Sequence, residues 1–237
     1  MLALHSLNEE SNCGKHTMSS EQLINHKDEI QAIDDDLILA SLNLLYRFFY
    51  FEPEDSLLLK VEESHILHFW QAEMGISTLE TEIFLSQASA LEQLQSDHLS
   101  LFVGIGMPKA MPWGSVYLSE DNLLLQKSTY ALAGFLEDKH LRFQLDEKQP
   151  LDHIGLCLSA LASLLERHIR AKDASSERCV CEFLCVHILP WSFRFTELLT
   201  KNAETALYRL LGKITLHTLT QLQAKWQLTP VQRQLYY

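Results

Sequence analysis

Glycine and proline are scarce in this chain, and their scarcity limits the folds that it can adopt. Eight glycines and six prolines are spread over 237 residues. That is too few for the many tight turns of a β-sandwich. The contents of apolar residues, 47%, and of charged residues, 21%, are those of an ordinary globular protein. A chain of this length can bury a large core without disulfides, so a helical globular fold is favoured.

Basic residues are also scarce. The chain has 19 Lys and Arg against 31 Asp and Glu, which gives a net charge of −12. Nucleic-acid binding needs clustered positive charge against the phosphates, so no nucleic-acid partner is expected, and a basic partner fits better. The first 36 residues hold eight carboxylates and two lysines, which is half of the net charge. This composition predicts an acidic, flexible leader over residues 1–35.

Long apolar runs and paired cysteines are missing as well. Uncharged stretches such as His153–Leu165 fall well short of the roughly 20 apolar residues that a membrane-spanning helix needs. The N-terminus does not show the basic region and apolar core of a secretory signal. Five cysteines, three of them within seven residues, make a poor disulfide framework and suit a reducing compartment. We therefore expect a cytoplasmic protein without an integral membrane segment.

Apolar residues recur at helical intervals over most of the chain after Asp36. They predict helices over 37–49, 53–70, 79–102, 128–139, 151–170, 176–188, 191–202 and 204–226. Prolines and glycines break the pattern over 104–115, which predicts a loop, and again at 146–150, which predicts a hinge. The expected fold is all-α: a single globular multi-helix domain, with two helical halves, 36–149 and 150–237, joined by this hinge.

One cluster of side chains suggests a metal site. Cys179, Cys181, Cys185 and His187 carry groups that bind zinc, so a metal-dependent enzyme is one alternative. Their spacing differs from that of familiar structural zinc sites, and no second Cys-x-x-Cys completes four ligands. Cysteines buried as small apolar side chains are the other reading. With no Gly-x-Ser-x-Gly elbow and no phosphate-binding loop either, we predict no catalytic residues and no metal.

Two short segments contain candidate binding residues. Trp113 lies between Pro112 and Gly114 in the predicted loop, where a large aromatic side chain can anchor a partner or fill the core. Asp152 and His153 begin a predicted helix, where the carboxylate can cap free N–H groups or contact a ligand. Residue types alone leave both pairs of alternatives open.

Four motifs in sequence resemble the signature of the TorD/DmsD family. They are Leu101-Phe102-Val103-Gly104, Pro112-Trp113-Gly114-Ser115-Val116-Tyr117, Pro150-x-Asp152-His153 and His187-x-x-Pro190-Trp191. Their order and spacing match over about residues 37–228, and the Pro-Trp-Gly-Ser-Val version is most similar to the dimethyl sulfoxide reductase chaperone branch. The resemblance implies an all-helical cytoplasmic chaperone. Such a chaperone binds the twin-arginine signal peptide of a molybdenum-cofactor reductase and delays export until the cofactor is inserted.

The same resemblance implies a set of signal-peptide-binding residues. The matched positions are Leu101, Phe102, Pro112, Trp113, Asp152 and His153. In this scheme the apolar side chains supply a groove and Asp152 accepts from a guanidinium group. The chain departs from its relatives at His98 and Ser100, where an aromatic residue and an arginine are common. An adaptor for another molybdoenzyme, such as a nitrate reductase or a formate dehydrogenase, is the alternative.

Family resemblance also sets expectations for cofactors and assembly. No cofactor is expected. Some relatives bind guanine nucleotide weakly, although no phosphate-binding loop is recognisable here. Members occur as monomers or as dimers that exchange helical halves, so a monomer or a domain-swapped homodimer is expected.

Overall fold

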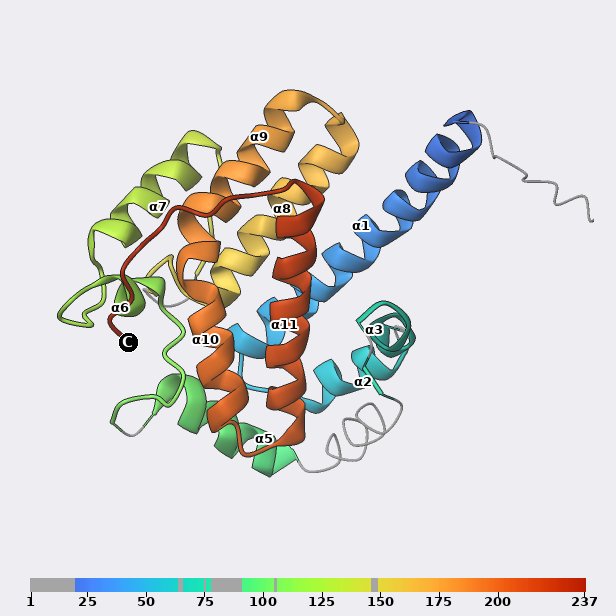
Figure 1. Cartoon of the computed structure of the whole chain (residues 1–237). Helices are drawn as coiled ribbons and strands as arrows, with labels where there is room; N and C mark the ends of the chain where they lie inside the picture. The colour runs from blue at the N-terminus through green and yellow to red at the C-terminus, as the bar shows by residue number, and fades with distance from the viewer. Residues whose placement is uncertain (1–19, 64–65, 75, 78–90, 105, 146–148) are drawn as a thin grey trace, which may run out of the picture. The chain divides into compact units, whose positions relative to one another are not determined.

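The described part of the chain is helical. The computed structural model describes residues 20–63, 66–74, 76–77, 91–104, 106–145 and 149–237. Among these residues there are helices and loops but no β-strand (Figure 1). The chain divides into two units, Met1–Asp34 and Asp35–Tyr237. The predicted all-α fold is confirmed, with its core in the second unit.

Helix α1 (Ser20–Tyr50) begins well before the predicted start near Asp36. Residues 20–34 contain Glu, Gln, Ala and Leu without glycine or proline, a composition that favours helix. Residues 1–19 of the predicted leader lie outside the described residues. The flexible leader therefore stays a prediction.

The remaining elements follow the predicted order. In the first part of the unit they are α2 (Asp55–Glu63), α3 (Ile66–Met74), α5 (Leu91–His98), the π-helical turn η1 (Leu99–Val103), α6 (Gly114–Leu118) and α7 (Lys127–Asp138). In the second part they are α8 (Ile154–Ala171), α9 (Ala174–Phe183), the π-helical turn η2 (Leu184–Ile188), α10 (Leu189–Asn202) and α11 (Ala206–Lys225).

One predicted helix is divided in two in the structure. The helix expected over 53–70 is found as α2 and α3, and residues 64–65 between them lie outside the described residues. Only 91–102 of the helix expected over 79–102 is described. Near Pro190 the predicted division is found: η2 ends at Ile188, and Pro190 lies in the first turn of α10, where its missing N–H has no helical partner to lose. Of the predicted hinge, Gln149 and Pro150 are described, whereas 146–148 are not.

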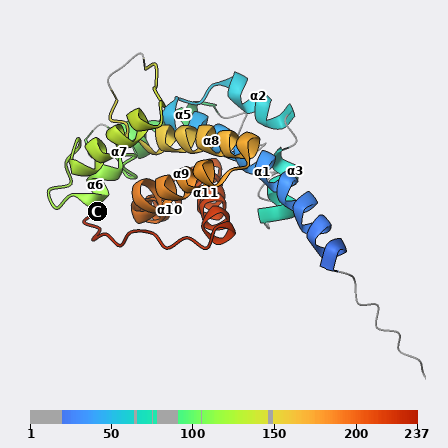
Figure 2. The same ribbon diagram turned by 90° about the horizontal axis from the view of Figure 1, so that it is seen from above.

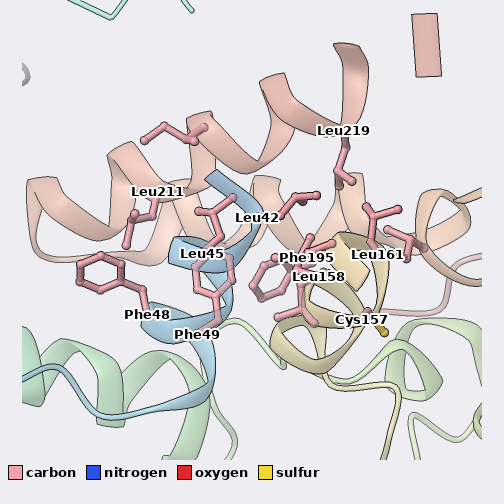
Figure 3. Packing of buried hydrophobic residues seen from close by; sticks show 14 of the residues in the cluster. Leu42, Leu45, Phe48, Phe49, Cys157, Leu158, Leu161, Phe195, Leu211 and Leu219 are labelled. Carbon is pink, nitrogen blue, oxygen red and sulfur yellow. The ribbon is translucent and has the colours of Figure 1, made fainter. Parts of the chain in front are cut away.

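The core lies where α1, α8, α10 and α11 meet. Figure 3 shows side chains from these four helices in contact, among them Leu45 and Phe49 of α1, Leu158 of α8, Phe195 of α10 and Leu211 of α11. Helix α10 packs along α11, and α8 packs along α9 (Figure 2). No helix of the described residues is both long enough and apolar enough to cross a membrane.

A buried carboxylate joins α5 to α11. The Asp97 side chain is 2% exposed, and its Oδ2 accepts from the backbone N–H of Thr205 at 2.8 Å and from the hydroxyl of Thr205 at 2.6 Å. Thr205 in turn is the N-cap of α11, where its side chain accepts from the N–H of Tyr208. This network positions α5, and with it η1, against the core.

The segment after α11, residues 228–237, returns across α10 and ends beside α6 (Figure 1). We call it the C-terminal segment. Its N–H groups at Val231 and Tyr236 donate to the carbonyl oxygens of Cys185 and Tyr117, each at 3.0 Å. The hydroxyl of Tyr237 donates to the carbonyl oxygen of Pro108 at 3.3 Å. The C-terminal segment therefore supports the loop that precedes α6.

Candidate binding site

The loop between η1 and α6 is fastened to the start of α8. Trp113 and His153 form an isolated antiparallel bridge. Beside it, the N–H of Gly114 donates to the carbonyl oxygen of Asp152 at 3.0 Å, and the N–H of Ile154 donates to that of Pro112 at 2.7 Å. These bonds bring the Pro-Trp-Gly motif and the Asp-His motif together in space.

The start of this loop depends on glycine. Gly104 follows η1 with φ of +69° and Gly106 has φ of +110°, values that side chains with a Cβ atom rarely adopt. The chain then folds back on η1, because the N–H of Lys109 donates to the carbonyl oxygen of Ser100 at 3.1 Å. This bond places the loop beside η1, which contains Phe102.

A groove of about 910 Å³ opens between the end of α1, the α5–η1 helix and Trp113. We call it the aromatic groove, after the rings that line it: Tyr46, Phe49, Tyr50, Phe51, His98, Phe102, Trp113 and His153. Several rings meet edge to face, with centroids 5.7 Å apart for Phe49 and Phe102 and 5.8 Å apart for Trp113 and His153. Such contacts hold the rings in fixed orientations.

Polar and aliphatic side chains surround these rings. The polar ones are Glu52, Gln95, Ser96, Gln144 and Gln149. The indole N–H of Trp113 donates to Oε1 of Gln149 at 3.2 Å, so the half-buried indole stands as one wall of the groove. Leu99 and Val103, which are 43% and 59% exposed, present apolar surface to solvent. A concave site that combines aromatic, aliphatic and polar side chains in this way is a candidate ligand-binding site.

Both histidines of the groove are neutral at physiological pH. Burial lowers the pKa of His98 to about 4, although a hydrogen bond with the carbonyl of Phe48 and the charge of Asp97 oppose the shift. Burial, reinforced by repulsion from His98, lowers the pKa of His153 to about 3. Nδ1 of His153 accepts from the N–H of Gly155 at 3.1 Å, which assigns the ring proton to Nε2. His153 is thus the N-cap of α8.

Asp152 faces away from the aromatic groove. Its carboxylate is 4% exposed, and Oδ2 accepts from the N–H of Ser115 at 2.6 Å and from the hydroxyl of Thr129 at 3.1 Å. The carboxylate therefore caps α6 and links it to α7, whereas its neighbour His153 caps α8. Asp152 lines a second space of about 430 Å³, the small cavity, together with Ser128, Trp191 and Arg233.

The six predicted binding residues are divided between three environments. Phe102, Trp113 and His153 line the aromatic groove. Leu101 and Pro112 are buried behind it, and Asp152 lines the small cavity. The structure thus brings three of the six to one surface.

Sequence reasoning missed the end of α1 as a part of the site. Tyr46, Tyr50, Phe51 and Glu52 line the aromatic groove. A signal was present: five of the six residues from 46 to 51 are aromatic. One buried stripe of a helix cannot accommodate that many consecutive rings, so some of them had to face elsewhere.

The cysteine cluster lies apart from the groove. No group of three or more His, Cys, Asp or Glu side chains in the described residues is placed to hold a metal ion. Burial raises the pKa of Cys179, Cys181 and Cys185, which favours the neutral thiols over the thiolates that bind zinc. His187 is likewise neutral, because burial lowers its pKa to about 4.

The described part of the chain is helical, and its aromatic groove is the candidate binding site. Comparison with known proteins identifies the family. The family model described as nitrate reductase delta subunit matches residues 70–197, more than half of the chain. The chain therefore belongs to this family, which contains the TorD and DmsD chaperones. The resemblance predicted from the four motifs is confirmed.

Relatives of the chain are named as chaperones rather than enzymes. It is 29% identical over 184 residues to the probable Tat proofreading chaperone DmsD of Haemophilus influenzae, covering 76% of this chain and 87% of the relative. It is 29% identical over 194 residues to the Tat proofreading chaperone DmsD of Salmonella typhimurium, covering 81% and 91%. A chaperone protein TorD of Actinobacillus succinogenes is 28% identical over 193 residues, covering 77% and 95%.

Proposed function

We propose that this protein is a maturation chaperone that binds the twin-arginine signal peptide of a molybdenum-cofactor reductase of the dimethyl sulfoxide reductase type. The peptide lies in the aromatic groove, and its retention there delays export until the cofactor has been inserted. The observation that carries this proposal is the groove itself, in which three of the predicted residues meet the aromatic end of α1.

The groove matches the apolar part of such a peptide. Phe49 and Phe102 form a floor that is almost fully buried, whereas Phe51, Leu99 and Val103 leave apolar surface exposed at its margin. Exposed apolar surface around a concave site favours burial under a partner. An apolar peptide segment laid along the groove would remove this surface from water and would itself be shielded from aggregation.

The groove also matches the two arginines. Guanidinium groups stack on aromatic faces, and the indole of Trp113 is the largest ring in the lining. Neutral His98 and His153 place no positive charge near an arriving cation. A signal held on these side chains is sterically inaccessible to the export machinery, which accounts for the delay without any catalytic step.

Fluorescence anisotropy with a synthetic peptide tests the proposal. The peptide carries two consecutive arginines followed by an apolar stretch of about ten residues. Trp113→Ala should weaken binding about tenfold or more, the loss typical of a tryptophan at the centre of an interface. Trp226→Ala is the matched control, because Trp226 is also half-buried but packs against His168 instead. Equal affinities of the two variants would contradict the proposal.

The identity of the client needs a second experiment. The matching family model is described as nitrate reductase delta subunit, which supports an adaptor for another molybdoenzyme subunit as the second candidate. Mass spectrometry of the proteins that co-purify with this chain from its native cell distinguishes the two. A catalytic subunit of the dimethyl sulfoxide reductase type with its signal still attached would support the first candidate. A nitrate reductase subunit would support the second.

A further inference from the structure

Among the described residues that line the aromatic groove, Glu52 is the one carboxylate, and neither lysine nor arginine accompanies it. We infer that Glu52 is the group that accepts hydrogen bonds from an arginine of the bound peptide. This inference rests on the proposed function and adds a specificity-determining residue to it. It also moves the acceptor role from Asp152 to a side chain at the end of α1.

The backbone on either side of Glu52 is held in place. The N–H of Phe51 donates to the carbonyl oxygen of Arg47 at 3.1 Å and completes the last turn of α1. On the other side, the side-chain amide of Gln95 donates to the carbonyl oxygen of Pro53 at 3.2 Å and links the turn to α5. The Glu52 side chain itself is exposed. A carboxylate on a fixed backbone is suited to receiving a ligand, because little further ordering is needed.

The charge of Glu52 is available to a ligand. Within the described parts of the chain it forms no ion pair. Burial, followed by the charges of Asp97 and Glu52, raises the pKa of Tyr208, whose hydroxyl lies 2.9 Å from Nδ1 of the groove residue His98. The other polar side chains of the lining are neutral amides, one hydroxyl and neutral imidazoles. Among the described residues, the single charged group of the lining is therefore the Glu52 carboxylate, and the guanidinium of Arg47, over the neighbouring Phe51 ring, is not part of the lining.

Asp152, the acceptor expected from the sequence, does not line the aromatic groove, although its buried Oδ1 has no hydrogen-bond partner among the described residues. Its Oδ2 accepts from the N–H of Ser115 and the hydroxyl of Thr129, and the residue lines the small cavity instead. At the Glu52 end, by contrast, a guanidinium is already present: that of Arg47 lies 5.0 Å from the centroid of the Phe51 ring. An aromatic ring and a carboxylate are adjacent in sequence here, and both groups bind guanidinium.

A double-mutant cycle tests the inference. Binding of the two-arginine peptide, and of a version with both arginines replaced by glutamine, is measured for the full chain and for Glu52→Gln. Glu52→Gln should weaken binding of the arginine peptide about fivefold, the upper end of what an exposed ion pair supplies. Binding of the glutamine peptide should not change. Glu54→Gln is the matched control, since it removes the same charge at an exposed position that does not line the groove.

The outcomes separate this inference from the proposed function. If Glu52→Gln and Glu54→Gln weaken binding of the arginine peptide equally while Trp113→Ala weakens it strongly, Glu52 is not the acceptor and the proposed function stands. If the unmodified chain binds both peptides equally, or neither, the proposed function is wrong and the inference is wrong with it. A loss confined to Glu52→Gln and to the arginine peptide supports both.

Discussion

At the scale of single residues, Asp152 was predicted to bind the peptide, but its hydrogen bonds stabilise the fold. Oδ2 is the acceptor for a buried backbone N–H at Ser115, and removing that acceptor leaves the N–H without a partner. Asp152→Ala should lower the free energy of unfolding by about 2 kcal/mol, within the range for an orphaned buried group. Asp152→Asn, which keeps one carbonyl oxygen as acceptor, should lose less. Urea unfolding measures both.

The same two variants separate structure from binding. If Asp152 acts through the cap, Asp152→Asn should bind the arginine peptide almost as well as the native chain does, and any loss in Asp152→Ala should follow its loss of stability. A large loss of affinity in Asp152→Asn at unchanged stability would instead show direct contact with the peptide, as first expected from the sequence.

His153 predicts a pH dependence. The unfolded chain binds a proton on this residue near pH 6.5, whereas the folded chain does so only near pH 3. Protonation of His153 therefore does not affect the free energy of unfolding above pH 6.5. As the pH falls from 6.5 toward 3, this free energy decreases by about 1.4 kcal/mol for each pH unit. His153→Asn keeps an acceptor for the N–H of Gly155 but does not titrate. Urea unfolding between pH 7.5 and 4.5 should show a shallower loss in this variant, and parallel curves would contradict the assignment.

Short motifs identified three residues that the structure places in one groove, and their role in binding stays a prediction. Phe102, Trp113 and His153 were identified from short motifs, and all three line one groove. The side on which Asp152 lies could not be predicted. Adjacent residues in an extended turn point in opposite directions, and the sequence alone does not indicate which of the two directions leads to the groove. Glu52 was missed because a lone carboxylate before a proline has the same pattern as an ordinary turn.

At the scale of elements, helical periodicity predicted where most helices lie but not the π-helical turns. Each such turn inserts one residue relative to an α-helix and rotates the side chains that follow. In η1 this rotation occurs at Leu99–Val103, which contains Phe102, and in η2 at Leu184–Ile188, which contains His187. Phe102 lines the groove and His187 lines the small cavity. Each π-helical turn therefore sets the direction of a side chain that lines one of these two spaces.

Two glycines form a matched test of packing at this scale. A Cβ on Gly114 would lie 2.7 Å from Cε2 and Nε1 of Trp191. That indole cannot move away easily, because it stacks on Tyr117 and donates to the carbonyl oxygen of His187. Gly114→Ala should destabilise the fold by about 1–3 kcal/mol. Gly134→Ala, on the outer side of α7 with nothing within 4 Å, should stabilise it by about 0.5–1 kcal/mol. Thermal unfolding of the two variants should give shifts of opposite sign.

At the scale of the whole molecule, the two predicted halves share their interior. Phe49 of the first half meets Phe195 of the second edge to face, with centroids 5.6 Å apart. Asp97 of the first half accepts from Thr205 of the second. The division at residue 150 and its hinge stay predictions. If halves are exchanged between two copies, these contacts must be rebuilt between the copies, so each groove would combine residues from both.

The cysteines give a whole-molecule test of the metal alternative. Replacing Cys179, Cys181 and Cys185 by serine together should leave the circular dichroism spectrum and peptide affinity close to those of the native chain, because the three side chains are half-buried and lie away from the groove. Metal analysis of the purified native protein is the complementary measurement. Zinc at one atom per chain, lost in the triple variant together with the fold, would restore the metal-dependent alternative.

The C-terminal segment has a consequence for the order of events during synthesis. Every described residue that lines the aromatic groove lies between Tyr46 and His153, yet the carbonyl oxygen of Pro108 and the ring of Tyr117 are supported by Tyr237. A ribosome adds the residues of this lining before it adds Tyr237. During synthesis the described residues of the groove lining therefore precede Tyr237, and we expect the loop beside them to become fixed only after Tyr237 has been added.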